Sequence, residues 1–284
     1  MFFPSSWLTS LDEEEPDWLQ ETIWDAILSL GPNLLDLAVE ADALQVPLND
    51  IELLTKLESI AFLSMPLGDA SAFVISPVSK LYFSSSNLKS ITIREDFSNP
   101  TLFSIRPLHM PSGPPSLRHL DVMNCLIPFD EPTTLFRLSN LTSLKYSIFP
   151  HILDSKYSLD KMWMALKKSG IQLEELELGE GTMTASLIDY LSTFSGLKKL
   201  HLNLIRSTSP TGTAAQFWSA AFPNHTNTLE DFALYAAEEG EWCFSTNNRP
   251  LIVQCTKLKL LGLCILSQFD QNVLLPMDDA VSSF

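Results

Sequence analysis

Residues 117–122 read LRHLDV: an apolar residue, two free positions, an apolar residue, one free position and a third apolar residue. The same pattern occurs eight times, with starts 24 to 32 residues apart. The other seven copies are LESIAF from Leu57, LKSITI from Leu88, LTSLKY from Leu141, LEELEL from Leu173, LKKLHL from Leu197, LEDFAL from Leu229 and LKLLGL from Leu258. A weaker ninth copy, LLDLAV, begins at Leu34. A period of this length indicates stacked copies of one structural unit.

The last four residues of each copy alternate as a β-strand does, which places the fourth and sixth positions on one face and the third and fifth on the other. One copy cannot bury its apolar face alone. Stacked side by side, the strands form a parallel sheet with one continuous leucine core. We therefore expect an α/β fold, an irregular solenoid with a parallel concave sheet and a convex side of mixed helices and loops.

The chain divides into four segments. Residues 1–16 are expected to be an acidic flexible tail, and residues 17–33 an N-terminal capping helix with apolar residues at helical spacing. Residues 34–267 form the solenoid of about eight or nine repeats. Residues 268–284 contain no further copy and are expected to be a C-terminal cap or tail.

The connectors between the strands differ in composition. Helices are expected at residues 157–169, 184–195 and 211–222, because each is periodic and followed by Gly or Pro. Residues 134–138 leave room for one helical turn. Residues 94–116 contain five prolines, which excludes a long helix.

The net charge is −16, and residues 1–50 contain eleven acidic residues and no Lys or Arg. Such a surface is a poor match for nucleic acid or an anionic membrane, since both require clustered Lys and Arg. No apolar run is long enough to span a bilayer, and the N-terminus does not resemble a signal peptide. Of the four cysteines, Cys125 and Cys264 fall in or next to repeat cores and are expected to be buried. A cytoplasmic or nuclear location is expected.

The exposed strand positions form two columns with one residue per repeat, and their charged members concentrate in the middle repeats. The candidate site consists of His119, Asp121, Lys145, Glu175, Glu177, Lys199, His201 and Asp231. The sign of charge also alternates from strand to strand. This alternation favours cross-strand ion pairs, and it also fits a polar surface that recognises a protein partner. The two interpretations are compatible.

Catalytic signatures are weak. Glu177 and His201 are expected on neighbouring strands, but no Ser or Cys in either column lies next to them to act as a nucleophile. His109, His151 and His225 fall in connectors, without a partner of that kind. Phosphate-loop, HExxH and GxSxG motifs are absent, as are cysteine pairs at zinc spacing. We expect no enzyme activity, no cofactor and no metal.

The eight copies resemble the leucine-rich-repeat superfamily, in particular its ribonuclease-inhibitor-like branch. Their unequal lengths and proline-rich connectors look like the repeat region of fungal F-box leucine-rich-repeat proteins. In that family the F-box binds a Skp-type adaptor of a cullin ubiquitin ligase, and the repeats select the substrate. Residues 1–33 do not match an F-box, so the chain is expected either to lack that domain or to be a repeat-only relative.

The function expected is that of a non-enzymatic protein-binding scaffold, and the resemblance adds substrate recognition for a ubiquitin ligase. A repeat-only scaffold with no ligase link is one alternative. A regulator is another, because aromatic and acidic residues alternate in the N-terminal segment, as in interaction segments. The aromatic residues concerned are Phe2, Phe3, Trp7, Trp18 and Trp24. An enzyme with its site in the connectors is the third.

Overall fold

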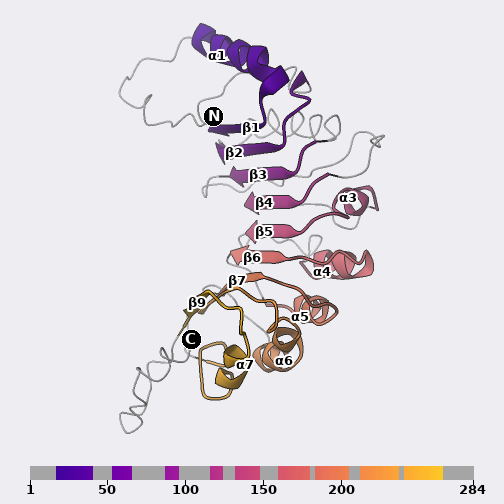
Figure 1. The fold of residues 1–284 in the computed structure, drawn as a ribbon, viewed down its shortest axis with the longest axis vertical. Coiled ribbons are helices and arrows are strands. Elements are labelled where there is room, and N and C mark those ends of the chain that lie inside the picture. The colour runs from indigo at the N-terminus through magenta and orange to yellow at the C-terminus, as the bar shows by residue number, and fades with distance from the viewer. Residues whose placement is uncertain are drawn as a thin grey trace. The chain divides into compact units, whose positions relative to one another are not determined.

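The structure is a computed structural model of the 284-residue chain. It describes residues 17–40, 53–65, 87–95, 116–123, 132–147, 159–179, 183–204, 212–236 and 240–264. Its strands are all parallel, and strands that are neighbours in space are also neighbours along the chain (Figure 1). The expected α/β class with a parallel sheet is therefore confirmed.

The chain divides into two compact units, residues 1–171 and 172–284. The first unit contains β1 (Asp36–Glu40), β2 (Ser59–Met65), β3 (Ser90–Glu95), β4 (His119–Met123) and β5 (Ser143–Ser147). The second contains β6 (Glu175–Gly179), β7 (Lys199–Leu204), β8 (Asp231–Ala236) and β9 (Leu260–Leu263). Every strand begins at the third position of its repeat, including β1 of the weak copy at Leu34, so the strand positions predicted from the sequence are confirmed.

The strands pair in the register that the repeat predicts. In the first unit, Ile60 pairs with Ile91 and Leu120 with Leu144, which are all fourth positions. In the second unit, Leu200 pairs with Phe232 at the same position. The register shifts once, between β2 and β3, near Met65. This register places equivalent side chains of successive repeats beside one another.

The apolar positions of the repeat form the core. Leu57, Leu88, Leu197 and Leu229, all at first positions, are fully buried. The last repeat differs, because Leu261 at its fourth position remains 37% exposed. The core is therefore less complete at β9 than at the preceding strands of the second unit.

A backbone ladder joins successive repeats just before each strand. The carbonyl oxygen of Glu58 accepts the N–H groups of Lys89 (2.7 Å) and Ser90 (3.0 Å). The carbonyl of Lys198 likewise accepts those of Glu230 (2.7 Å) and Asp231 (3.0 Å). One second-position carbonyl thus satisfies two N–H groups of the next repeat, which locks the register before the strand begins.

In the described residues, two helices precede β1 and the others lie between β4 and β9 along the chain. The helices are α1 (Asp17–Leu30), η2 (Gly31–Asn33), α3 (Pro132–Arg137), α4 (Leu159–Lys168), α5 (Ala185–Leu191), α6 (Thr213–Gln216), η7 (Phe217–Ala221), η8 (Phe222–Asn224) and α7 (Arg249–Val253). In Figure 1, α3 and α4 lie on one side of the strands of the first unit, and α5 and α6 lie on one side of those of the second. Among the described residues, no helix is long and apolar enough to cross a membrane.

Most expected helices are present. The helix expected at the start of residues 17–33 is α1, and the turn expected near Thr134 is α3. Helix α4 ends before Gly170, whose φ of 66° is the left-handed conformation that glycine adopts readily. The capping role of α1 stays a prediction. The tail at 1–16, nearly all of the proline-rich connector and residues 268–284 lie outside the described residues.

Two helix predictions need correction, and one helix was missed. The helix expected at residues 211–222 is divided into α6, the π-helix η7 and the 3-10 helix η8, which continues past Pro223 to Asn224. Helix α5 ends at Leu191, several residues before Gly196. The Ser192 and Thr193 hydroxyls, just after its end, donate hydrogen bonds to the carbonyls of Ile188 (2.7 Å) and Tyr190 (2.6 Å). Helix α7 was not predicted. It has five residues with Pro250 in its first turn, which is too short to show helical periodicity.

Candidate functional site

The polar columns consist of the third- and fifth-position side chains of the repeats. In the second unit, Glu175 pairs with Lys199, which pairs with Asp231 in the third-position column. Glu177 pairs with His201 in the fifth-position column. The five predicted site residues of this unit therefore share one face of three adjacent strands, β6 to β8.

His201 lies between two carboxylates. Its Nε2 is 2.7 Å from Oδ1 of Asp231, and its Nδ1 is 4.0 Å from Oε2 of Glu177. Lys199 Nζ lies 3.4 Å from the same Glu177 oxygen. The four side chains are 23–33% exposed, so they remain accessible to a partner. Together Glu177, Lys199, His201 and Asp231 form a cluster that we call the central charge cluster.

This cluster does not resemble a nucleophile–base pair. Both ring nitrogens of His201 face carboxylates, whereas a catalytic histidine of the hydrolase type orients one nitrogen toward a Ser or Cys. Within the residues that the structure describes, no group of three His, Cys, Asp or Glu side chains could hold a metal ion. What the cluster offers is alternating charge and hydrogen-bonding groups on a sheet face.

The remaining predicted residues belong to the first unit. Asp121 pairs with Lys145 in the fifth-position column, and His119 is exposed in the third-position column. Asp121 forms an ion pair with Arg94, whose Nη2 lies 2.6 Å from Oδ2. Arg94 occupies the seventh position of its repeat and was not predicted. Its signal in the sequence is a basic residue directly after an expected strand, one repeat before Asp121.

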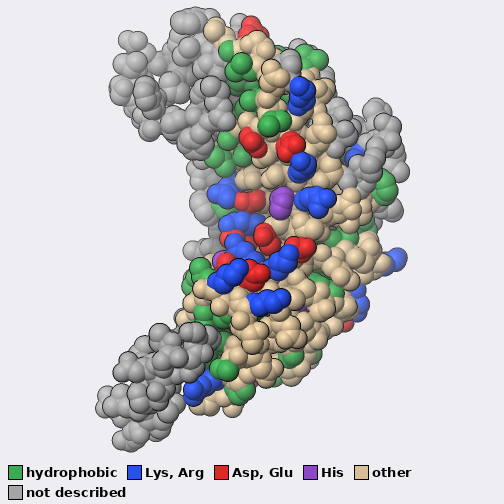
Figure 2. Space-filling model, in the orientation of Figure 1, with side chains coloured by type: hydrophobic (Ala, Val, Ile, Leu, Met, Phe, Trp, Pro, Cys, Tyr) green, Lys and Arg blue, Asp and Glu red, His purple; other side chains and the backbone are tan. Residues whose placement is uncertain are grey.

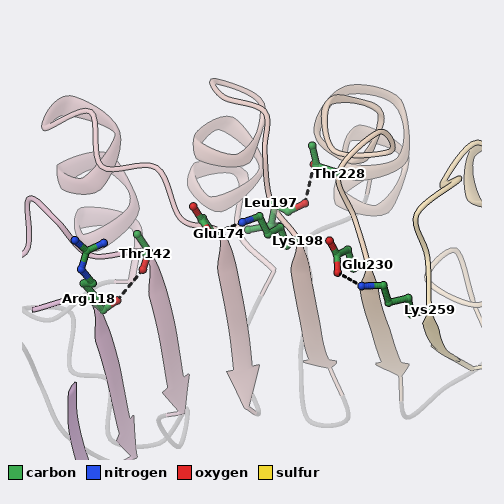
Figure 3. A network of polar contacts seen from close by, with 8 residues as sticks. All are labelled: Arg118, Thr142, Glu174, Leu197, Lys198, Thr228, Glu230 and Lys259. Atoms are coloured by element: carbon green, nitrogen blue, oxygen red, sulfur yellow. Dashed lines mark hydrogen bonds and ion pairs between the residues drawn. The ribbon is translucent and has the colours of Figure 1, made fainter. Parts of the chain in front are cut away.

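A third column lies at the second position, next to the backbone ladder, and carries further ion pairs. Lys198 contacts Glu174 at 2.7 Å, and Lys259 contacts Glu230 at 2.6 Å (Figure 3). Lys89 contacts Glu58 at 2.8 Å in the first unit. The cross-strand ion pairs expected from the sequence are thus present. These second-position residues were left out of the predicted site, although the letters E, K, E and K recur there in the last four copies.

The ion pairs of this column shift the pKa values of their members. The hydrogen bond to Glu174, followed by the charge of that carboxylate, raises the pKa of Lys198. The hydrogen bond from Lys259, followed by its charge, lowers the pKa of Glu230. Both side chains lie in solvent, so these pairs contribute little to folding stability.

Charges of both signs mix on the surface. In Figure 2 the Lys and Arg side chains alternate with the Asp and Glu side chains instead of forming one patch of a single sign. The face becomes apolar at the end of the second unit, where Asp231 pairs with Leu260. Leu260 is 52% exposed and Tyr235, on β8, is 49% exposed. The charged columns are therefore followed by an apolar surface at β8 and β9.

His225 is a polar residue that the sequence did not identify as important. It is 1% exposed and hydrogen-bonded at both ring nitrogens, to the Leu191 carbonyl (3.0 Å) and the Leu197 N–H (3.4 Å). Cys264 was expected to be buried but is partly exposed, while Cys125, His109 and His151 lie outside the described residues. The role of His225 is structural, since its ring points into the packing between helix α5 and strand β7.

Comparison with known proteins adds no relative: no protein-family model matches the chain, and a search of curated proteins finds no match.

Proposed function

We propose that the chain is a non-enzymatic leucine-rich-repeat scaffold that binds a protein partner through the polar columns of its strands. The observation that carries this proposal is the central charge cluster, in which four partly exposed charged or titratable side chains from three strands are held in fixed register. Repeat proteins bind their partners on the concave sheet face that such columns form.

The two sides of the cluster favour a partner with both charged and apolar groups. The columns are charged at Lys199 and Asp231 and apolar at Leu260 and Tyr235. Protein interfaces combine an apolar contact with a charged rim in this way. A small polar substrate would use the charges and leave the apolar side empty.

The binding test uses the full chain in its own cell extract, with mass spectrometry of the co-purified proteins. Lys199→Glu combined with His201→Glu should reduce recovery of the partner by about tenfold or more, because two contacts of the cluster become repulsive. Lys199→Gln with His201→Gln is a milder version that adds no carboxylate. Retention of the partner at full yield by both versions would remove the central charge cluster from the interface.

A matched control reverses one lysine elsewhere. Lys168 is exposed at the end of helix α4, so Lys168→Glu also reverses one lysine charge but does not touch the polar columns. This variant should retain the partner. Circular dichroism and thermal unfolding confirm that all variants are folded.

The narrower candidate is the substrate-recognition part of an F-box-type ubiquitin ligase adaptor, favoured by the irregular repeat lengths and proline-rich connectors of the sequence. A Skp-type adaptor and a cullin among the co-purified proteins would support it. A partner retained without them would support the repeat-only scaffold. Loss of the partner on deletion of residues 1–30 alone would support the regulator that binds through its acidic–aromatic segment.

A further inference from the structure

Two cysteines of the second unit lie in contact. The sulfur atoms of Cys243 and Cys264 are 3.5 Å apart, although the residues are 21 positions apart in the sequence. Cys243 is fully buried and Cys264, directly after β9, is partly exposed. The chain between them contains helix α7 and strand β9, so the contact closes a loop around the last repeat.

Backbone hydrogen bonds fix both cysteines. The carbonyl of Cys243 accepts a bond from the side-chain amide of Asn248 (3.0 Å), which is itself 3% exposed. The carbonyl of Cys264 accepts the N–H of Phe244 (2.8 Å), and its N–H donates to Leu234 (3.2 Å). A disulfide requires the sulfur atoms to approach to about 2.05 Å. The remaining movement of about 1.5 Å is of the size that rotation of the two side chains produces.

We propose that Cys243 and Cys264 are a thiol modification site that forms a reversible disulfide on exposure to a peroxide. The thiolate of the more accessible Cys264 attacks one oxygen of hydrogen peroxide, the O–O bond breaks, and Cys264 becomes a sulfenic acid while the released hydroxide takes a proton to form water. Cys243 then loses its proton and attacks the Cys264 sulfur. The S–S bond forms, and hydroxide leaves with that proton as a second water. Two thiols and one peroxide thus give one disulfide and two waters, and a dithiol reductant reverses the reaction.

The disulfide would link the end of β9, the last described strand, covalently to the helical layer of the same unit. The segment before Cys243 is held there, because Trp218 Nε1 donates to the Glu241 carbonyl (3.3 Å) and the rings of Phe217 and Trp242 are 5.6 Å apart. Strand β9 is where the core is least covered, with Leu261 37% exposed. Oxidation therefore stabilises the end of the unit that packing protects least.

Cys255 provides a matched control in the same unit. It is 4% exposed, and its sulfur donates to the Leu251 carbonyl at 3.6 Å. Burial raises the pKa of its thiol to about 11, which keeps it protonated and slow to react with peroxide. Peroxide should therefore leave Cys255 a thiol under conditions that link Cys243 to Cys264.

The test treats the reduced full chain with hydrogen peroxide and maps its peptides without reduction. We expect a Cys243–Cys264 linked peptide, a mass loss of two hydrogen atoms and full reversal by dithiothreitol. The Tm of the oxidised chain should rise by roughly 5–10 °C, as expected for closing a loop of about 20 residues. Cys255→Ser should keep the link and the rise in Tm, whereas Cys264→Ser and Cys264→Ala should lose both.

Three results would overturn the proposal: oxidation of Cys264 to sulfinic acid while Cys243 stays a thiol, linkage of either cysteine to Cys125 or Cys255, or linkage between two chains. If neither Cys264 variant folds, the peptide map of the wild-type chain beside that of Cys255→Ser still decides the question. Binding of the partner is not part of this readout, so the proposed function and the disulfide can fail separately.

Discussion

His225 holds parts of two consecutive repeats together through its ring. The N–H of Leu197 points at Nδ1, so this nitrogen accepts and the proton of the neutral imidazole is assigned to Nε2, which donates to the Leu191 carbonyl. The Phe194 ring packs against the imidazole edge with a centroid distance of 5.1 Å. The backbone carbonyl of His225 also accepts the N–H of Leu229, the first residue of the following repeat (2.9 Å). If Nδ1 were protonated, its N–H would face the N–H of Leu197, and this hydrogen bond would be lost.

The stability of the second unit should therefore depend on pH. Burial lowers the pKa of His225, opposed only in part by its hydrogen bond to Leu191. The unfolded chain has an ordinary histidine pKa of about 6.5 and binds more protons than the folded chain below that value. The free energy of unfolding is thus fully present above about pH 6.5. It should fall as the pH drops toward the folded pKa, with a limiting slope of about 1.4 kcal/mol per pH unit.

The measurement is urea unfolding of the full chain at several pH values between 5 and 8, beside His225→Gln. The glutamine amide can donate to the Leu191 carbonyl but does not titrate. The difference in unfolding free energy between the two chains should therefore narrow as the pH falls. A difference that stays constant over this range would show that folding does not change the pKa of His225.

At the level of the strand, leucines at the same position of the motif can contribute very different amounts to the free energy of unfolding. Leu176 and Leu261 both occupy the fourth position of their repeats, but Leu176 is 0% exposed and Leu261 is 37% exposed. Leu176→Ala should cost roughly 2–5 kcal/mol of unfolding free energy, as for other buried leucines, and Leu261→Ala about 1 kcal/mol or less. Urea unfolding followed by circular dichroism measures both. Equal losses would mean that Leu261 is as well packed as the interior leucines.

The strands could be predicted more reliably than the connectors, for a physical reason. Apolar spacing specifies which residues face the core, and all nine described strands begin where the motif places them. The helix ends depend on single side chains, such as the Ser192 hydroxyl, and on contacts with other repeats. Helix α7 has only five residues, and no period is visible over that length.

For the candidate site, the sequence predicted which residues share a column but not which side chains meet. The register places Glu177 opposite His201, yet the shorter contact of His201 is diagonal, to Asp231 at 2.7 Å. Asp121 is opposite Lys145, and it forms an ion pair with Arg94, which lies diagonally across from it on β3. Neighbouring side chains in a sheet lie within reach both directly and diagonally. Side-chain rotamers and the local twist of the sheet decide whether the direct or the diagonal contact forms, and a repeat motif gives no information about either.

Within one unit, successive parallel strands can differ in stability, because each strand contacts mainly its neighbours. Strands β8 and β9 of the second unit show such a difference. Asp231 is the first residue of strand β8, which has a paired strand on each side, and its N–H donates to the Lys198 carbonyl (3.0 Å). Leu260 is the first residue of β9, the last described strand, where the core is partly exposed. Its N–H makes the equivalent bond to the Glu230 carbonyl (3.2 Å).

We therefore expect the two amides to differ in hydrogen exchange despite their equivalent bonds. Among the described strands of this unit, β9 pairs with one strand and β8 with two, so opening of β9 disrupts fewer interfaces. The Leu260 amide should therefore exchange at least about tenfold faster than the Asp231 amide after correction for intrinsic rates. Exchange measured by NMR or mass spectrometry on the reduced full chain tests this. Equal protection of the two amides would mean that strands β8 and β9 open together as one cooperative unit, and the single-residue losses at Leu176 and Leu261 would then have to be interpreted as changes in that unit and not in separate repeats.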